Sequence, residues 1–252
     1  MLISTSRIEN TRIHAQDGTI GKIETFLFDE EQWVLRYIVA KHGFLFFGGR
    51  KLLSPVSVTG TIGETDAEIR VGLTREQVKN APPANLARPI SRRKEEQFHR
   101  YYQIPVYWGG AGLWGTAMTP MEAGTVTYEP APTDEPAQAD SDEYHLRSTE
   151  EVEGYRVEAK GERVGSVSGF QIEDTTWAVR YLSVEMEEGQ GDGQLFISPH
   201  WVDEISWIER KLKLDMPADR LREMPTVGVR GALAREDEEK LHEFFGQPRY
   251  WK

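Results

Sequence analysis

The chain contains no cysteine among its 252 residues. Disulfide bonds, thiolate metal sites, iron–sulfur clusters and cysteine nucleophiles are therefore excluded. Long apolar runs are missing as well, since the densest one, Phe44-Leu45-Phe46-Phe47, falls far below the ~18 residues that a membrane helix needs. No apolar stretch of signal-peptide length follows Met1. From these absences we expect a soluble protein of the cytoplasm that does not insert into a membrane.

Basic residues are outnumbered, because 30 Lys and Arg stand against 41 Asp and Glu and give a formal net charge of −11. This balance disfavours a general nucleic-acid-binding face, so we expect no DNA partner and do not expect an RNA partner. One basic cluster is an exception, and its simplest interpretation is a solvated helix face. The cluster consists of Arg88, Arg92, Arg93, Lys94 and Arg100.

Common catalytic and nucleotide-binding motifs are missing too. The sequence has no GxGxxG after a strand, no Walker loop, no GxSxG and no HExxH. The six histidines are scattered, and no Ser-His-Asp set is legible. We therefore expect no enzyme activity, no catalytic residue and no cofactor.

One pattern is typical of a metal site. Glu96-x-x-His99 recurs as Glu239-x-x-His242, and two such pairs form half of the di-iron site of some four-helix bundles. No such bundle is predicted here, because the helices that would carry the additional carboxylates are missing. We therefore expect each histidine to cap or pack its own helix, and we expect no metal.

What the sequence does contain is a repeat. The chain matches itself at a shift of 144 residues, and after the loss of one residue the shift becomes 143. The pattern predicts an internal duplication, with residues 1–108 as a first copy and residues 146–252 as a second. The matched pairs include Leu2 and Leu146, Arg12 and Arg156, Gly21 and Gly165, Trp33 and Trp177, Arg36 and Arg180, Tyr37 and Tyr181, Glu95 and Glu238, His99 and His242, Tyr107 and Tyr250, and Trp108 and Trp251.

Residues 109–145, between the copies, form an acidic segment rich in Gly and Pro. Such a composition cannot bury enough apolar surface to offset the entropy of ordering the chain. We expect a linker, parts of which pack locally through Leu113, Trp114 or Tyr128.

Each copy carries mostly the signals of β-strands. In the first copy a turn at Asp17-Gly18 leads into strands over 19–28, and a polar turn leads into a strand over 33–40. This last segment is apolar on both faces apart from Arg36, which is typical of a strand inside a barrel or under a covering element. Further short strands over 52–56 and 68–71 favour a small barrel.

Two short helices are expected to close each copy. Thr74-Arg75-Glu76-Gln77 has the form of a capping box, and Pro82-Pro83 stops the helix that follows. The second helix covers residues 91–102 and has three aromatic side chains on one face. The sequence thus predicts a mainly β chain with short helices, in which two tandem small barrels are each followed by a helical tail.

These residues resemble the PRC-barrel family, which is named for the cytoplasmic barrel of the H subunit of the bacterial photosynthetic reaction centre. In the first copy the matching pattern is Asp17-Gly18-x-x-Gly21-Lys22-Ile23, Trp33-x-x-Arg36-Tyr37-Ile38-Val39 and Leu53-Ser54-Pro55. The second copy repeats it as Gly165-Ser166-Val167, Trp177-x-x-Arg180-Tyr181-Leu182 and Ile197-Ser198-Pro199. The resemblance implies six-stranded PRC-type barrels and a docking or regulatory role rather than a particular activity.

Two sets of residues are expected to have a structural role in both copies. Arg36 and Arg180 lie among apolar strand residues, where a charge needs a partner, so we expect an internal salt bridge or a stacked guanidinium. The tails Tyr107-Trp108 and Tyr250-Trp251 are expected to act as structural clasps, because aromatic side chains bury a large area with few rotors to freeze.

The copies differ most at one loop. The first copy has Phe44-Leu45-Phe46-Phe47 where the second has Glu188-Gly189-Gln190-Gly191. If exposed, the four bulky residues would form a contact patch, whereas the alternative is that they cover the open end of their own barrel. Phe44, Leu45, Phe46 and Phe47 are therefore our candidate protein-contact residues.

Function classes stay open at this point, and we favour the first of three. The first is a non-enzymatic binding, assembly or regulatory module that contacts a protein partner or a second copy of itself. The second is an enzyme or small-ligand-binding protein with a site between the two copies. The third, an RNA- or ribosome-associated factor, is disfavoured by the acidic charge.

Overall fold

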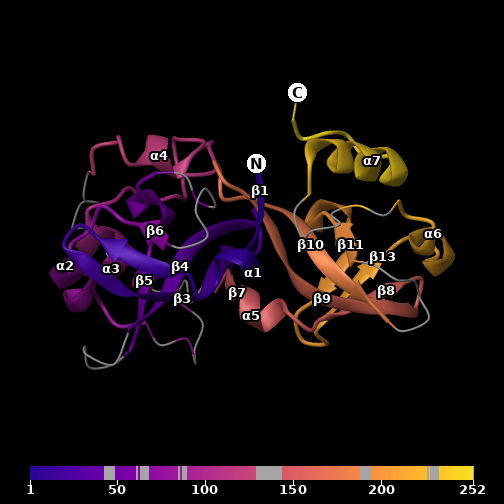
Figure 1. Cartoon of the computed structure of the whole chain (residues 1–252), viewed down its shortest axis with the longest axis horizontal. Helices are drawn as coiled ribbons and strands as arrows, with labels where there is room; N and C mark the ends of the chain where they lie inside the picture. The colour runs from indigo at the N-terminus through magenta and orange to yellow at the C-terminus, as the bar shows by residue number, and fades with distance from the viewer. Residues whose placement is uncertain are drawn as a thin grey trace. The chain divides into compact units, whose positions relative to one another are not determined.

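A computed structural model describes residues 1–42, 49–60, 62, 68–84, 86, 90–128, 144–187, 194–225, 227 and 233–251 (Figure 1). The protein is mainly β, with two sheets and several short helices. The predicted contact residues Phe44–Phe47 lie outside the described residues. Among the helices of the described part, none is long and apolar enough to cross a membrane.

The chain divides into two compact units. The N-terminal unit consists of Ile8–Ser148 and Asp174–Ala178. The C-terminal unit consists of Met1–Arg7, Thr149–Glu173 and Val179–Lys252. Each unit thus contains most of one sequence copy together with short segments of the other.

The N-terminal unit is built on a sheet with the strand order β5-β4-β3-β2-β6, to which β7 adds by pairing with β3. The pair β2 with β6 is parallel and the other pairs are antiparallel. The strands are β2 (Arg12–Ala15), β3 (Gly18–Asp29), β4 (Val34–His42), β5 (Arg50–Leu53), β6 (Glu68–Arg70) and β7 (Leu146–Ser148). The helices are η1 (Pro55–Ser57), α2 (Arg75–Asn80), α3 (Arg92–Tyr102) and α4 (Pro120–Ala123).

The C-terminal unit has the order β11-β10-β9-β8-β13-β12, to which β1 adds by pairing with β9. Its parallel pair is β8 with β13. The strands are β1 (Leu2–Ser4), β8 (Arg156–Ala159), β9 (Glu162–Glu173), β10 (Val179–Met186), β11 (Gln194–Ile197), β12 (Glu204–Ser206) and β13 (Lys211–Leu214). The helices are α5 (Thr149–Val152), η2 (Pro199–Trp201), α6 (Ala218–Arg222) and α7 (Arg235–Phe245).

The two sheets share one strand order. Strands β2 to β5 correspond to β8 to β11 at the 144-residue offset, β6 corresponds to β13, and β12 is additional. The similar order expected from the sequence is confirmed. The named strands of the described residues do not pair into a closed barrel. The strands at the two ends of the order are β5 and β6 in one unit and β11 and β12 in the other, and in neither unit do these two pair with each other.

The core of the N-terminal unit lies on both faces of β4, where every residue from Val34 to Ala40 is buried. Trp33, which the sequence pattern places in this strand, instead has a φ of 55° and closes the turn before it. Its amide donates to the carbonyl of Asp29 over 2.8 Å, and its ring stacks on Phe28 at 4.9 Å. Trp177 has a φ of 61° at the equivalent position. A tryptophan in the left-handed region therefore lies just before this strand in both halves of the chain.

The helices begin where the sequence predicts. The capping box is present, because the side chain of Thr74 accepts from the amide of Gln77 and the side chain of Gln77 accepts from the amide of Thr74. Helix α2 ends just before Pro82-Pro83, and the predicted helix over 91–102 forms as α3 with Ser91 as its N-cap.

Short strands are exchanged between the two halves of the chain. Strand β1, which α1 (Thr5–Ile8) follows, lies in the sheet of the C-terminal unit, where Leu2 pairs with Glu173. Figure 1 shows this indigo strand beside the orange strands of that unit. Strand β7 lies in the sheet of the N-terminal unit, where Leu146 pairs with Asp29. The two pairs have the same register, because both partners are offset by 144 residues.

The described part of the predicted linker, residues 109–128, is folded. The amide of Gly112 donates to the carbonyl of Gly115 over 2.8 Å, and the amide of Trp114 donates to the carbonyl of Ala117 over 2.9 Å. A Cβ atom added to Gly112 would lie 2.2 Å from the carbonyl oxygen of Ala117, so glycine is required for this close approach. The glycines that look like linker composition therefore serve a tight loop, which positions Leu113 and Trp114.

Candidate functional site

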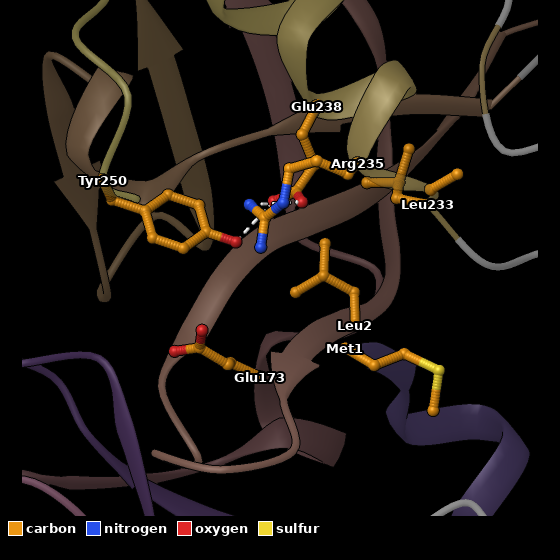
Figure 2. A pocket seen from close by; sticks show the side chains of 8 residues that line it. Met1, Leu2, Glu173, Leu233, Arg235, Glu238 and Tyr250 are labelled. Atoms are coloured by element: carbon orange, nitrogen blue, oxygen red, sulfur yellow. Dashed lines mark hydrogen bonds and ion pairs between the residues drawn. The ribbon is translucent and has the colours of Figure 1, made fainter. Parts of the chain in front are cut away.

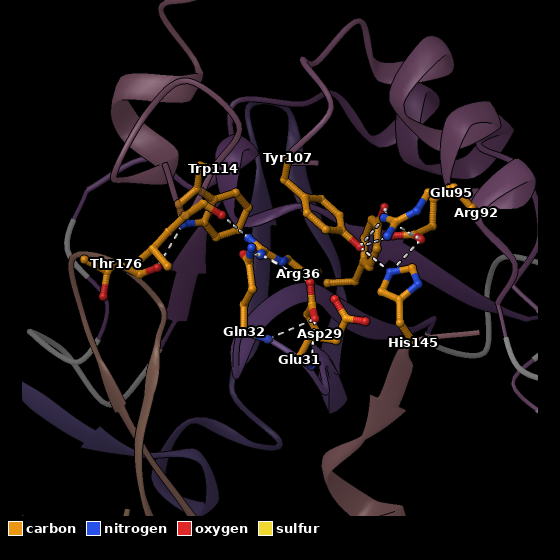
Figure 3. Close-up of polar contacts among 12 residues, drawn as sticks. Asp29, Glu31, Gln32, Arg36, Arg92, Glu95, Tyr107, Trp114, His145 and Thr176 are labelled. Atoms are coloured by element: carbon orange, nitrogen blue, oxygen red, sulfur yellow. Dashed lines mark hydrogen bonds and ion pairs between the residues drawn. The ribbon is translucent and has the colours of Figure 1, made fainter. Parts of the chain in front are cut away.

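Arg36 lies in the middle of β4, and its side chain is fully buried. Its guanidinium donates to the carboxylate of Asp29 over 3.4 Å and to the side-chain oxygen of Gln32 over 2.5 Å. A third bond goes to the main-chain carbonyl of Leu113. Figure 3 shows Asp29 and Gln32 beside the guanidinium. Because a buried cation is costly unless it is paired and hydrogen-bonded, these partners are what permit an arginine in an apolar strand.

Two aromatic rings cover the same guanidinium. Its central carbon lies 4.0 Å from the ring centre of Tyr107 and 5.1 Å from that of Trp114. The indole N–H of Trp114 donates to the carbonyl of Thr176 over 2.9 Å, which fixes the ring. Burial lowers the pKa of Arg36, whereas Tyr107 and Asp29 oppose that effect. Arg36 is thus both ion-paired and stacked.

Glu95, on α3, is a second buried charge, with no exposed side-chain surface. Its carboxylate accepts hydrogen bonds from the hydroxyls of Tyr107 over 2.5 Å and Tyr37 over 3.1 Å. A guanidinium nitrogen of Arg92 lies 3.4 Å from it and an imidazole nitrogen of His145 lies 3.1 Å from it. These four donors replace the water that the carboxylate loses on burial.

The protonation of this cluster follows from its geometry. Burial, assisted by Glu95, raises the pKa of Tyr37 and of Tyr107 well above the usual range, so both hydroxyls keep their protons and donate. Nitrogen Nε2 of His145 also lies 2.9 Å from the Tyr107 hydroxyl. Because a carboxylate can only accept, Nε2 of His145 must carry the proton. One imidazole N–H thus completes the cluster.

His99, the histidine of the metal-like pattern, uses both ring nitrogens within the fold. Nδ1 lies 2.8 Å from the carbonyl of Pro105, and Nε2 lies 3.0 Å from the hydroxyl of Tyr37. Burial lowers its pKa. His242 makes the equivalent contacts with Gln247 and Tyr181. In the described residues no group of three or more acidic or histidine side chains could hold a metal ion.

The C-terminal unit repeats seven positions of the cluster. Arg180 donates to Glu173 over 2.6 Å and lies 4.1 Å from the ring centre of Tyr250. Glu238 accepts from the hydroxyls of Tyr250 and Tyr181, and it pairs with Arg235 over 2.8 Å. The equivalent pairs are Asp29 and Glu173, Arg36 and Arg180, Tyr37 and Tyr181, Arg92 and Arg235, Glu95 and Glu238, His99 and His242, and Tyr107 and Tyr250.

The two clusters differ in how they are covered. The side chain of Arg36 has 0% exposed surface, whereas that of Arg180 has 20%. Leu113 and Trp114 close the first cluster, but among the described residues only Tyr250 stacks on Arg180. As far as residues 144–225 and 233–251 are described, the cluster of the C-terminal unit is therefore open on the side that Leu113 and Trp114 close in the other unit.

A pocket of about 250 Å³ lies beside the open cluster (Figure 2). Its wall includes Leu2, Glu173, Arg235, Glu238 and Tyr250. Figure 2 shows the guanidinium of Arg235 between the Tyr250 hydroxyl and the Glu238 carboxylate, while the side chain of Met1 is directed away from them. Polar and charged groups of Glu173, Arg235, Glu238 and Tyr250 thus line a recess that an outside group can enter.

The sequence-predicted residues lie mainly in these clusters. Arg36, Arg180, Tyr37, Tyr181 and the tail aromatics are all part of them, although Trp108, Tyr250 and Trp251 are only partly buried. In the tail of the first copy, Tyr107 contacts both Arg36 and Glu95. Sequence reasoning missed the central carboxylates, Glu95 and Glu238. Their recurrence at the 143-residue offset, next to the histidines, was the signal that could have found them.

Comparisons of the sequence with the models of known protein families and with curated proteins found no match. The resemblance to the PRC-barrel family therefore rests on the residues quoted above.

Proposed function

We propose that the protein is a non-enzymatic binding and assembly module of the cytoplasm, formed by duplication of a PRC-type barrel, which binds a protein partner through the C-terminal unit. The recurrent strand order and the recurrent cluster support the duplication. Barrel closure is supported by the isolated bridges Arg50–Ala84 and Val58–Val71, which continue the pairing beyond β5 and β6. DNA and RNA are not part of the proposal.

One observation carries the binding role: the same buried cluster is covered in one unit and open in the other. The cover of the first cluster is a tight loop, which supplies a carbonyl to Arg36 and an indole ring over it. Arg180 presents the same guanidinium, partly exposed and already stacked on Tyr250. Arginine and tryptophan are the residue types that contribute most to protein–protein affinity. A partner segment with a free carbonyl next to an aromatic side chain therefore fits the C-terminal unit.

The chain supplies its own probe for this proposal. A peptide with the sequence of residues 109–118 contains the cover, and it can be added to the full-length protein in solution. The cover of the N-terminal unit is intramolecular and so competes with the peptide at a high effective concentration. We therefore expect the peptide to bind at the C-terminal unit, with shifts in the NMR signals of Arg180 and Tyr250.

The matched control is the same peptide with alanine in place of Trp114. Loss of the ring should weaken binding about tenfold or more, which corresponds to roughly 1.4 kcal/mol. Because the protein is unchanged in this comparison, a difference cannot come from unfolding. Equal binding of both peptides, or no binding of either, contradicts the proposed role.

A further inference from the structure

The pocket of the C-terminal unit has an occupied counterpart in the N-terminal unit. Leu2 pairs with Glu173 in the same register in which Leu146 pairs with Asp29. The residues that precede these leucines, Met1 and His145, therefore hold equivalent positions. The walls correspond as well, with Arg235, Glu238 and Tyr250 in place of Arg92, Glu95 and Tyr107.

The counterpart is filled by an imidazole. His145 is 4% exposed, and its Nε2 lies 3.1 Å from Glu95 and 2.9 Å from the Tyr107 hydroxyl. The other ring nitrogen, Nδ1, is buried without a partner among the described residues. The slot thus recognises one N–H and the flat ring that carries it.

In the C-terminal unit no histidine is among the residues that line the recess. Met1 is 67% exposed, and the recess beside it has a volume of about 250 Å³. This is below the roughly 300–1,000 Å³ typical of sites for drug-sized ligands, so it suits one ring-bearing side chain.

The charges of the slot favour an N–H donor. Glu238 is 2% exposed and holds the bonds of Arg235, Tyr250 and Tyr181, which match three of the four donors around Glu95. The fourth donor around Glu95, the imidazole N–H of His145, has no counterpart among these three donors to Glu238. Burial raises the pKa of Glu238 against the opposing effect of Tyr250 and Arg235, as expected of a carboxylate whose donors do not fully replace water.

We infer that the pocket formed by Glu238, Tyr250, Arg235 and Leu2 binds an imidazole, which a histidine side chain of the protein partner supplies. This inference deepens the proposed function, on which it rests for the source of the ring. An anion does not fit, because Glu238 would repel it. The chemistry is recognition of a neutral or protonated imidazole through one N–H, with no bond made or broken.

The test uses the full-length protein and two probes that differ by the position of one methyl group. At about pH 8.5, above the usual histidine pKa of about 6.5, both free bases are neutral. 4-Methylimidazole is the histidine ring with its Cβ and keeps an N–H, whereas 1-methylimidazole has none. We expect saturable NMR shifts at Glu238 and Tyr250 with 4-methylimidazole, and at least tenfold weaker binding of 1-methylimidazole. Equal binding of both probes, or no saturable shift with either, overturns the inference.

Two variants locate the site. In Met1→His, made with one residue added before it, the new ring fills the slot from within the chain, so the melting temperature should rise and probe binding should be lost. In His145→Ala, an equivalent slot opens in the N-terminal unit, and 4-methylimidazole should restore part of the lost melting temperature. If 4-methylimidazole rescues His145→Ala but does not bind the C-terminal unit of the unchanged protein, the inference about the C-terminal pocket is wrong.

A third probe tests the source. N-acetylhistidine methylamide presents the ring as a protein does and should bind at least as tightly as 4-methylimidazole. If it fails while 4-methylimidazole binds, the slot takes a free small imidazole and the partner's histidine is ruled out. Failure of all imidazole probes together with binding of the 109–118 peptide leaves the proposed function standing without this inference.

Discussion

The imidazole of His145 lies 3.1 Å from the carboxylate of Glu95. Both residues belong to the N-terminal unit, although residues 109–128 lie between them in the sequence. This contact joins the start of β7 to the buried cluster on α3. It also shows that the N-terminal unit is complete only when residues beyond the first copy have folded onto it. The equivalent position in the C-terminal unit holds Met1, which is 67% exposed, whereas His145 is 4% exposed.

Removal of one hydroxyl from the covered cluster should be costly. Tyr107→Phe takes a hydrogen bond from the fully buried Glu95, and bonds to charged groups contribute about 1.5–3 kcal/mol. We expect a loss of about that size in the free energy of unfolding, measured by urea denaturation. The matched variant Tyr250→Phe should lose less, because Tyr250 is partly exposed and water can reach its partner. Equal losses for both variants would show that the covering of the cluster has no effect on its stability.

The indole of Trp114 should matter more than that of Trp251. Trp114 is 3% exposed, so Trp114→Ala should cost about 3–5 kcal/mol, as large aromatic truncations in cores do. Trp251 is partly exposed and packs on Arg235 at 4.2 Å, so Trp251→Ala should cost on the order of 1–2 kcal/mol. Thermal melting of both variants checks which substitution lowers the stability more. A larger loss for Trp251→Ala than for Trp114→Ala would contradict this prediction.

The glycines of the loop that carries Trp114 allow a paired test. Gly112→Ala places a Cβ 2.2 Å from the carbonyl oxygen of Ala117, and overpacking of this kind costs about 1–3 kcal/mol. Gly124→Ala is the control, because its Cβ meets nothing closer than 3.4 Å and its φ of −64° suits alanine. We expect tryptophan fluorescence and melting temperature to change in the first variant and to stay within error in the second. Unchanged values in both would mean that the loop does not need its close approach.

Stability should fall on mild acidification. Burial lowers the pKa of His99 and of His242 below the usual value of about 6.5 that the unfolded chain has. Below that pH the unfolded chain binds protons that the folded chain refuses, so the stabilising effect is fully present above about pH 6.5 and is lost as the pH falls toward the folded pKa. Urea denaturation between neutral pH and about pH 5 should show this loss, with a shallower slope in His99→Gln. An unchanged slope in that variant would assign the acid sensitivity to other groups.

The strand exchange predicts that a divided chain stays together. If residues 1–135 and 136–252 are produced as separate polypeptides, the first contributes β1 to the C-terminal unit and the second contributes β7 and residues 174–178 to the N-terminal unit. We expect the two fragments to co-purify. Deletion of residues 1–5 from the first fragment should weaken that association, and separate elution of two folded fragments would contradict the exchange.

Much of the fold was predictable because it depends on local signals. The capping box at Thr74 and the apolar segment after Trp33 each have a local cause, and both lie where the sequence indicates. Trp33 itself was misplaced, since its left-handed backbone is set by the turn from Asp29 and not by its β propensity.

The missing parts depend on pairings between distant residues. A three-residue strand such as β1 pairs equally well with either sheet as far as sequence pattern shows, so the exchange was not foreseeable. The polar cluster was half foreseeable, because the buried Arg36 required a partner, but its partners Leu113 and Trp114 lie in a segment with the composition of a linker. The barrel expected from the resemblance requires pairings that the strands of the described residues do not make.

The exchange of β1 and β7 sets an order of events during synthesis. Residues 1–7 are made long before β9, the strand with which β1 pairs. The N-terminal unit in turn waits for Trp177, whose carbonyl accepts from the amide of Leu35 over 2.9 Å. The folding of the N-terminal unit therefore stays incomplete until residues 174–178 have been made, so the second half of the chain is already in synthesis when the first unit closes.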